Sequence, residues 1–172
     1  MPDLIAALRT LFETVGEFES SIEFRGSLYV MPWTTVFHVL GMCLVAGTLV
    51  MMDLRLLGVA NMSTAFSQLQ RRLFPWQMAG MAVAAVTGMA LLYGNPMSFF
   101  ANIIFWIKMG TMAIAGVNAM AFHYITYRNV ADWDAGVTPP LGAKLAGVLG
   151  ILLWANVIVA GRLIPYNWFR AD

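Results

Sequence analysis

The sequence predicts an all-α integral membrane protein, a bundle of four transmembrane helices with an N-terminal amphipathic helix at the membrane interface. Of its 172 residues, 60% are hydrophobic and 11% are charged, whereas a soluble domain has about 25% charged residues. The mean hydropathy is +0.72. The apolar residues form four runs, each close to the roughly 20 residues that cross a bilayer. Because these runs fill most of the chain, we expect one domain, residues 1–172.

The four predicted spans cover about residues 28–57, 75–93, 99–127 and 141–164. The second begins at the pair Pro75-Trp76, and Pro139-Pro140 precedes the fourth, since proline is a frequent signal for a helix start. Asp132 and Asp134, in the last connection, are expected to be solvated turn residues.

The N-terminal segment, about residues 3–22, is predicted to be one helix lying on the membrane surface. Its apolar residues recur at helical spacing, which gives the segment one apolar face: Leu4, Leu8, Leu11, Phe12 and Val15. The alternative interpretation is a helix that packs against a partner protein.

Basic residues near the span ends predict the orientation. The two longer connections carry most of them, namely Arg55, Arg71, Arg72, Arg128 and Lys144. These connections are therefore expected in the cytoplasm, with both termini on the outer, periplasmic side of a bacterial inner membrane. Arg9, Arg25 and Arg162 lie on the outer side and weaken the contrast.

Composition also excludes several classes of function. The net charge is +1, so there is no basic surface for nucleic acid. Cys43 is the single cysteine, which excludes an internal disulfide and any multi-cysteine metal centre. No Ser/His/Asp set, glycine-rich phosphate loop or carboxylate cluster is present. Substrate chemistry therefore has no separate support, and whether the protein is an enzyme stays open.

Two histidines, His38 and His123, lie inside predicted spans, where an imidazole is costly unless it is paired, hydrated or bound to a metal. His38 precedes Asp53 by 15 residues, and Lys108 precedes His123 by 15 residues. A separation of this size corresponds to roughly 22 Å along a helix. We therefore expect His38 level with Lys108 near the outer face, and Asp53 level with His123 near the inner face. The two histidines cannot then bind the same iron within one subunit.

His38 is the stronger candidate for a haem b ligand. Gly41, less than one turn away, leaves a predicted gap for a flat macrocycle, and Met89 or Met109 at similar depth would supply a sixth ligand. The cations Lys108, Arg25 and Arg162 are candidates to pair with haem propionates. The alternative is a histidine hydrogen-bonded within the bundle without any metal.

For His123, two interpretations stay open: ligation of a second cofactor, or pairing with Asp53. Asp53 and Arg55 are accordingly candidates to stabilise the fold or to orient a metal-binding histidine through a hydrogen bond. The 13 methionines, together with imidazole, also suit Cu(I), which makes copper the alternative metal.

The chain resembles an uncharacterised family of small four-helix bacterial membrane proteins. The motifs that carry the resemblance are His38-Val39-Leu40-Gly41, Gly47 and Asp53-Leu54-Arg55-Leu56-Leu57-Gly58 in the first span, with Gly26-Ser27-Leu28-Tyr29, Pro32, Pro75-Trp76 and Lys108 elsewhere. This family is loosely similar to the membrane domain of copper-resistance D-type proteins. The resemblance implies a fold more than an activity. Better-known four-helix membrane cytochromes b carry two histidines per haem, and this chain has only two in all.

The expected function is that of a b-type cytochrome-like protein that passes electrons in or across the membrane. Its partners would be the lipid bilayer and either quinone or a periplasmic electron carrier. Small residues at four-residue spacing, such as Gly142, Ala146 and Gly150, make a homo-oligomer plausible. Two alternatives are a copper or other metal transporter and a cofactor-free accessory subunit of a membrane complex.

Overall fold

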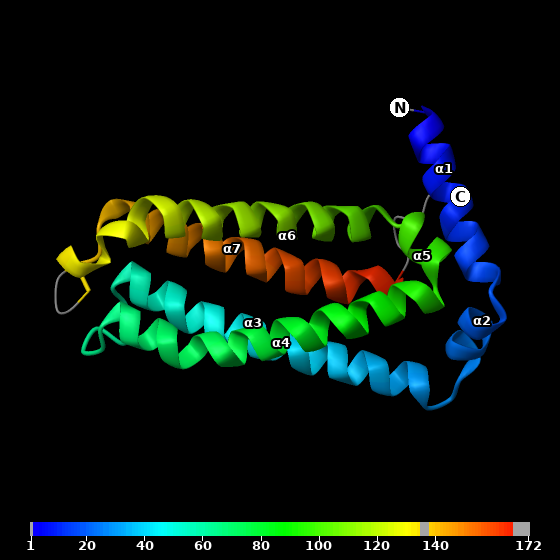
Figure 1. Ribbon diagram of the computed structural model, residues 1–172, viewed down its shortest axis with the longest axis horizontal. Helices are drawn as coiled ribbons and strands as arrows, with labels where there is room; N and C mark the ends of the chain where they lie inside the picture. The colour runs from blue at the N-terminus through cyan, green and yellow to red at the C-terminus, as the bar shows by residue number, and fades with distance from the viewer. Residues whose placement is uncertain (1, 135–137, 167–172) are drawn as a thin grey trace.

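The computed structural model describes residues 2–134 and 138–166, and this part of the chain is helical and contains no strand (Figure 1). Residues 1, 135–137 and 167–172 of the predicted domain lie outside the described residues. The α-helices are α1 (Pro2–Glu17), α2 (Glu19–Gly26), α3 (Val30–Leu57), α4 (Phe66–Gly94), α5 (Pro96–Phe100), α6 (Ile103–Ala121) and α7 (Leu141–Leu163).

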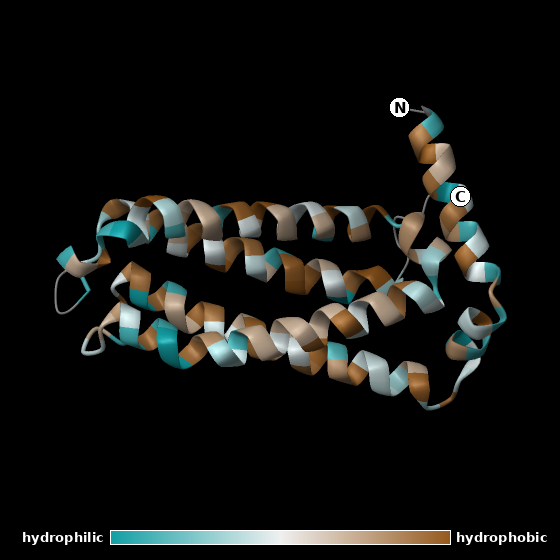
Figure 2. Ribbon diagram, in the orientation of Figure 1, coloured by the Kyte–Doolittle hydropathy of each residue, from teal (hydrophilic) through white to brown (hydrophobic). Residues whose placement is uncertain are grey.

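Four helical segments are long and apolar enough to cross a membrane: α3, α4, α7 and the stretch Ile103–Asp132. The last of these comprises α6, the π-helical turn η1 (Phe122–Thr126) and the 3₁₀ turn η2 (Tyr127–Asp132). They run side by side, and hydrophobic colour extends along all four (Figure 2). The all-α prediction with four potential spans is confirmed.

Glycines let the long helices approach closely. A Cβ atom at Gly41 of α3 would lie 2.9 Å from the Ala84 nitrogen and 3.0 Å from the Gly80 oxygen of α4. A Cβ at Gly147 of α7 would lie 2.9 Å from the Asp53 carbonyl oxygen of α3. α3 therefore packs against both α4 and α7, and α7 in turn packs against α6. Such backbone approach is typical of membrane helices, where small residues replace a hydrophobic driving force.

Polar side chains tie α6 to α7. Asn156 donates a hydrogen bond to the Thr111 hydroxyl at 2.7 Å, and Asn118 donates to the Ala146 carbonyl at 3.0 Å. At the other end of α6, Asn102 accepts from the Ile104 N–H and donates to the Ile164 carbonyl. One buried amide thus caps the start of α6 and satisfies a carbonyl at the end of α7.

The helix start predicted at Pro75 is wrong. α4 begins at Phe66, and Pro75 lies inside it. Asp134 explains the earlier start, because its carboxylate accepts hydrogen bonds from the Ser67 N–H at 2.8 Å and the Ser67 hydroxyl at 2.5 Å. Asp134 is therefore not the solvated turn residue that was predicted. It caps α4 from a segment far away in the sequence.

The N-terminal segment forms two helices rather than the single helix predicted. Phe18, between α1 and α2, has an extended backbone conformation with φ −61° and ψ 132°. α1 crosses the end of the bundle at a steep angle to the four long helices (Figure 1), and its Phe12 ring lies 5.2 Å from the Phe100 ring of α5. α2 is held to α4 by buried Ser21, which donates to the Tyr93 carbonyl at 2.8 Å.

Candidate functional site

The cavity of interest lies in the half of the bundle nearer α5 and has a volume of about 630 Å³. Its walls come mainly from α3 and α7, with contributions from α4, α5 and α6. Three residues predicted for the haem site line it: His38 of α3, Lys108 of α6 and Arg162 of α7. The structure thus brings together three side chains from positions far apart in the sequence.

The hydrogen bonds of His38 fix its tautomer. Nδ1 lies 3.0 Å from the Ala84 carbonyl oxygen and 3.1 Å from the Thr87 hydroxyl oxygen. The Thr87 hydroxyl already donates to the Val83 carbonyl at 2.6 Å. Because a carbonyl can only accept, Nδ1 must carry the hydrogen, which leaves a lone pair on Nε2. A backbone carbonyl that holds one imidazole nitrogen is the usual support for a metal-binding histidine.

Gly88 allows α4 to contact the His38 ring. A Cβ atom at position 88 would lie 3.0 Å from the His38 Cε1 atom. The ring therefore lies against α4, in contact with Gly88 and with the two acceptors on Ala84 and Thr87.

The two cations of the cavity differ in their surroundings. Lys108 is half-buried, and a Cβ atom at Gly161 would lie 3.3 Å from its Nζ, so the ammonium lies along α7. Arg162 is exposed, with its guanidinium 5.7 Å from the centre of the Tyr166 ring. No Asp or Glu is among the residues that line the cavity in the described part of the chain. The cavity is therefore positively charged and mostly apolar.

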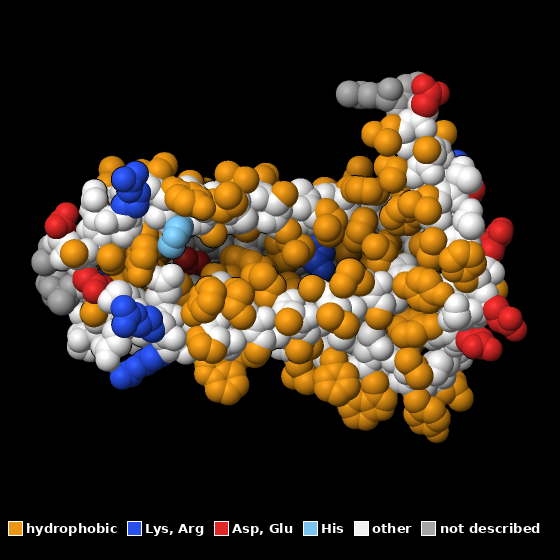
Figure 3. Space-filling model, viewed as in Figure 1, with side chains coloured by type: hydrophobic (Ala, Val, Ile, Leu, Met, Phe, Trp, Pro, Cys, Tyr) orange, Lys and Arg blue, Asp and Glu red, His pale blue; other side chains and the backbone are white. Residues whose placement is uncertain are grey.

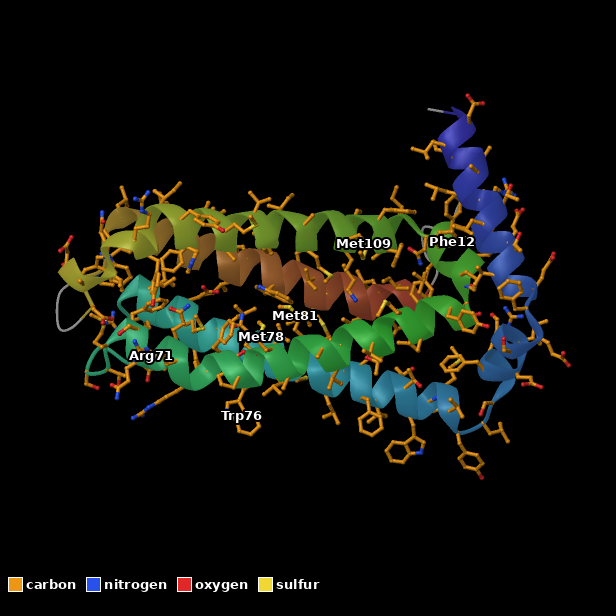
Figure 4. The ribbon with its side chains drawn as sticks, viewed as in Figure 1. Phe12, Arg71, Trp76, Met78, Met81 and Met109 are labelled. Carbon is orange, nitrogen blue, oxygen red and sulfur yellow. The ribbon has the colours of Figure 1, made fainter. Side chains whose placement is uncertain are left out.

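Other residues predicted for this site lie elsewhere. Met89 is 63% exposed and lines a second hollow with Phe12 of α1. Met109, labelled on α6 in Figure 4, does not line the cavity, and Arg25 is exposed on α2 outside it. The lining contains instead three sulfur-bearing residues of α3 that were not predicted as haem ligands, Met31, Met42 and Cys43; of these, Met42 was predicted as a soft ligand in the copper alternative. The sequence does contain a signal for this: Met31, Thr35, His38 and Met42 follow one another at spacings of three or four residues, which places them on one helix face.

The predicted gap at Gly41 is occupied by α4. The Ala84 and Gly80 backbone atoms lie where a side chain at position 41 would be. Gly41 therefore serves the contact between α3 and α4 and opens no space for a macrocycle.

At the opposite end of the bundle, Asp53 is 8% exposed, and its Oδ2 atom is buried with no hydrogen-bond partner. His123 is exposed in the π-helical turn η1 and stacks on Tyr127, with ring centroids 5.3 Å apart. No ion pair joins Asp53 and His123 in the part of the chain that the structure describes. His123 is also absent from the lining of the cavity that contains His38.

Arg55 is fully buried and holds two connections together. It donates to the Thr64 carbonyl at 2.9 Å, to the Asp134 carbonyl at 3.0 Å and to the Met62 sulfur at 3.6 Å. Since its charge is enclosed, Arg55 is a structural residue of the loop end and not a solvated loop charge.

No group of three or more His, Cys, Asp or Glu side chains that could hold a metal ion occurs within residues 2–134 and 138–166. A metal at His38 would therefore be held by one histidine together with non-protein ligands or soft sulfur donors.

The four helical segments that are long and apolar enough to cross a membrane are consistent with a multi-pass helical membrane protein. The chain belongs to a family of unknown function, DUF6644, whose family model matches residues 19–167. The searches of curated proteins and of solved structures found no match.

Proposed function

We propose that this protein is a membrane haem b protein in which His38 would bind the iron and which passes electrons in or across the bilayer. The observation that carries the proposal is the tautomer of His38, which leaves a lone pair on Nε2 of a ring that lines a cavity with two cations. When bound, haem would supply a one-electron carrier. The partner in that transfer would be quinone or a periplasmic electron carrier.

The residues present suit this group. The cavity volume lies within the roughly 300–1,000 Å³ of small-molecule and cofactor sites. Lys108 and Arg162 would hold the two propionate carboxylates, which would give the Lys108 ammonium the anionic partner that the cavity lining does not supply. Thr87 and the Ala84 carbonyl keep the His38 imidazole oriented and protonated at Nδ1.

The proposal includes one histidine ligand and no methionine from another helix. Met31 and Met42 line the cavity but belong to α3, the same helix as His38. A methionine one turn away on the same helix cannot reach the opposite face of an iron bound at His38. The proposed centre therefore does not use Met89 or Met109.

The proposed location is a bacterial inner membrane, with the end that carries the α3–α4 and η2–α7 connections in the cytoplasm. Exposed Arg71, Arg72 and Arg128 support this orientation, since basic residues favour the cytoplasmic side. Figure 3 shows Lys and Arg side chains together with a few acidic ones at that end, and mainly acidic side chains along the opposite end, over α1 and α2.

The test is the visible spectrum of the purified protein after expression with ample haem supply. We expect a Soret band that His38→Ala abolishes and that the matched variant His123→Ala retains, because only His38 lines the cavity. A colourless wild-type protein, or an unchanged band in His38→Ala, would refute the proposal.

One observation favours a second candidate, the handling of copper ions. Met31, Met42 and Cys43 line the same cavity as His38, and thioether, thiolate and imidazole donors suit Cu(I). The resemblance to the membrane domain of copper-resistance D-type proteins supports this candidate as well. Metal analysis of the same preparation distinguishes the two: iron with a Soret band supports haem, and copper without visible colour supports copper.

A further inference from the structure

We propose that Asp53 is a proton-binding site within the membrane, a carboxylic acid held neutral between α3 and α7 that exchanges its proton with the aqueous phase at the loop end. The inference is independent of haem, because Asp53 lies outside the cavity of His38 and 15 positions further along the same helix.

The carboxyl group of Asp53 is buried. Asp53 is 8% exposed, and its Oδ2 has neither solvent contact nor a hydrogen-bond partner in the described part of the chain. The group lies against α7 so closely that a Cβ atom at Gly150 would be 2.5 Å from Oδ2 and 2.9 Å from Oδ1. An ionised carboxylate is stable in such a place only if a cation or several donors compensate for its lost hydration.

The charged groups that surround Asp53 come from α3, α4, α7 and η1. Arg55, two residues away, directs its guanidinium to carbonyls and a sulfur in the loops. Arg71 and Arg72 are exposed on α4, Lys144 is half-buried on α7, and His123 is exposed in η1 (Arg71 is labelled in Figure 4). None of these residues forms an ion pair with Asp53 within residues 2–134 and 138–166.

A buried acid without a counter-ion avoids the cost of its charge by binding a proton. The aqueous phase at the loop end is the nearest source, since Asp53 is four residues from the end of α3 at Leu57, or about 6 Å along the helix. Uptake converts the carboxylate and one proton into the neutral acid, and release reverses it. Ionisable groups inside membrane proteins commonly mark such proton or ion sites.

The experiment uses a lipophilic carbodiimide, dicyclohexylcarbodiimide, on the wild-type protein in detergent at neutral pH. A protonated carboxyl adds across the carbodiimide and rearranges to a stable N-acylurea, so peptide mass spectrometry identifies the modified residue. We expect modification at Asp53, loss of modification in Asp53→Asn, and retention in the matched variant Asp132→Asn, because Asp132 is exposed in η2. Modification should decrease as the pH is raised.

Infrared spectroscopy provides a second measurement on the folded protein. We expect the carbonyl band of a protonated carboxylic acid at neutral pH, which isotope-labelled aspartate shifts in the wild type and which Asp53→Asn removes. Absence of both this band and the carbodiimide adduct would overturn the proposal. Protection of Asp53 from the carbodiimide by Na⁺ at constant pH would also overturn it, in favour of a sodium site.

Discussion

Substitution of Gly41 by alanine tests whether the contact between α3 and α4 also holds the His38 imidazole in position. The new Cβ atom would lie 2.9 Å from the Ala84 nitrogen, whereas ordinary contacts begin at 3.4 Å, so the helices must separate by about 0.5 Å. The two nearest atoms, the Ala84 nitrogen and the Gly80 oxygen, belong to the backbone of α4 and cannot move without the helix. The hydrogen bond between His38 Nδ1 and the Ala84 carbonyl oxygen is 3.0 Å long. If the helices separate by this amount along the direction of that hydrogen bond, its length becomes about 3.5 Å, beyond the range of a hydrogen bond.

The control for this variant is Gly47→Ala on the same helix, where nothing lies within 4 Å of the new Cβ. Both variants gain about 1 kcal/mol from the better helix propensity of alanine, so this gain cancels in a comparison between them. The remaining difference is the cost of overpacking, about 1–3 kcal/mol. We therefore expect Gly41→Ala to unfold at a lower temperature, or at a lower concentration of denaturing detergent, than Gly47→Ala.

The assay combines a thermal unfolding curve in detergent with the visible spectrum of each variant. Gly41→Ala is expected to lose stability and to bind haem more weakly, because the Ala84 carbonyl that accepts the hydrogen bond from His38 is displaced. Equal stability of the two variants would refute the packing argument. A destabilised Gly41→Ala protein with an unaltered spectrum would refute the link between this contact and the imidazole.

Two further substitutions test the caps that join distant segments, both by thermal unfolding in detergent. Asp134→Ala removes the acceptor for the Ser67 N–H and hydroxyl, so we expect a loss of about 1 kcal/mol. Asp132→Ala, at an exposed position, should stay within about 0.5 kcal/mol of the wild type; an equal loss in both would argue against a cap. Asn102→Ala leaves the Ile164 carbonyl without its amide donor, and we expect a loss of about 1–3 kcal/mol. Wild-type stability of Asn102→Ala would contradict this role.

The sequence was informative about the spans because hydrophobic run length depends only on local composition. It was misleading at Pro75, because the residue that sets the start of α4 is Asp134, about 67 positions away in the chain. A cap contributed by a distant segment gives no sequence signal near the start of the helix that it caps. The break at Phe18 was missed for a similar reason, since α2 is fixed by its contacts with Tyr93 at the end of α4.

The candidate site, too, was predicted only in part from the sequence. Depth arithmetic placed His38 level with Lys108, and both line one cavity. Depth alone does not specify which way a side chain faces, however. Met89 and Met109 were chosen for their depth, but both are largely exposed and absent from the cavity lining. Gly41 was interpreted as a gap, whereas a glycine in a membrane helix equally allows a second helix to approach.

The position of α3 links the two proposals. Residues 38 and 53 are 15 positions apart, which at about 3.6 residues per turn brings them to faces roughly 60° apart. The first face presents His38 to the α4 carbonyl and to the cavity, and the second presents Asp53 to the glycines of α7. Because α3 packs against α4 and α7 through glycines, a side chain added at Gly88 should disturb His38, and one added at Gly150 should disturb Asp53. If Gly150→Ala altered the haem spectrum as strongly as Gly88→Ala, the two sites would not be separate, and the proton site could not be treated as independent of the cavity.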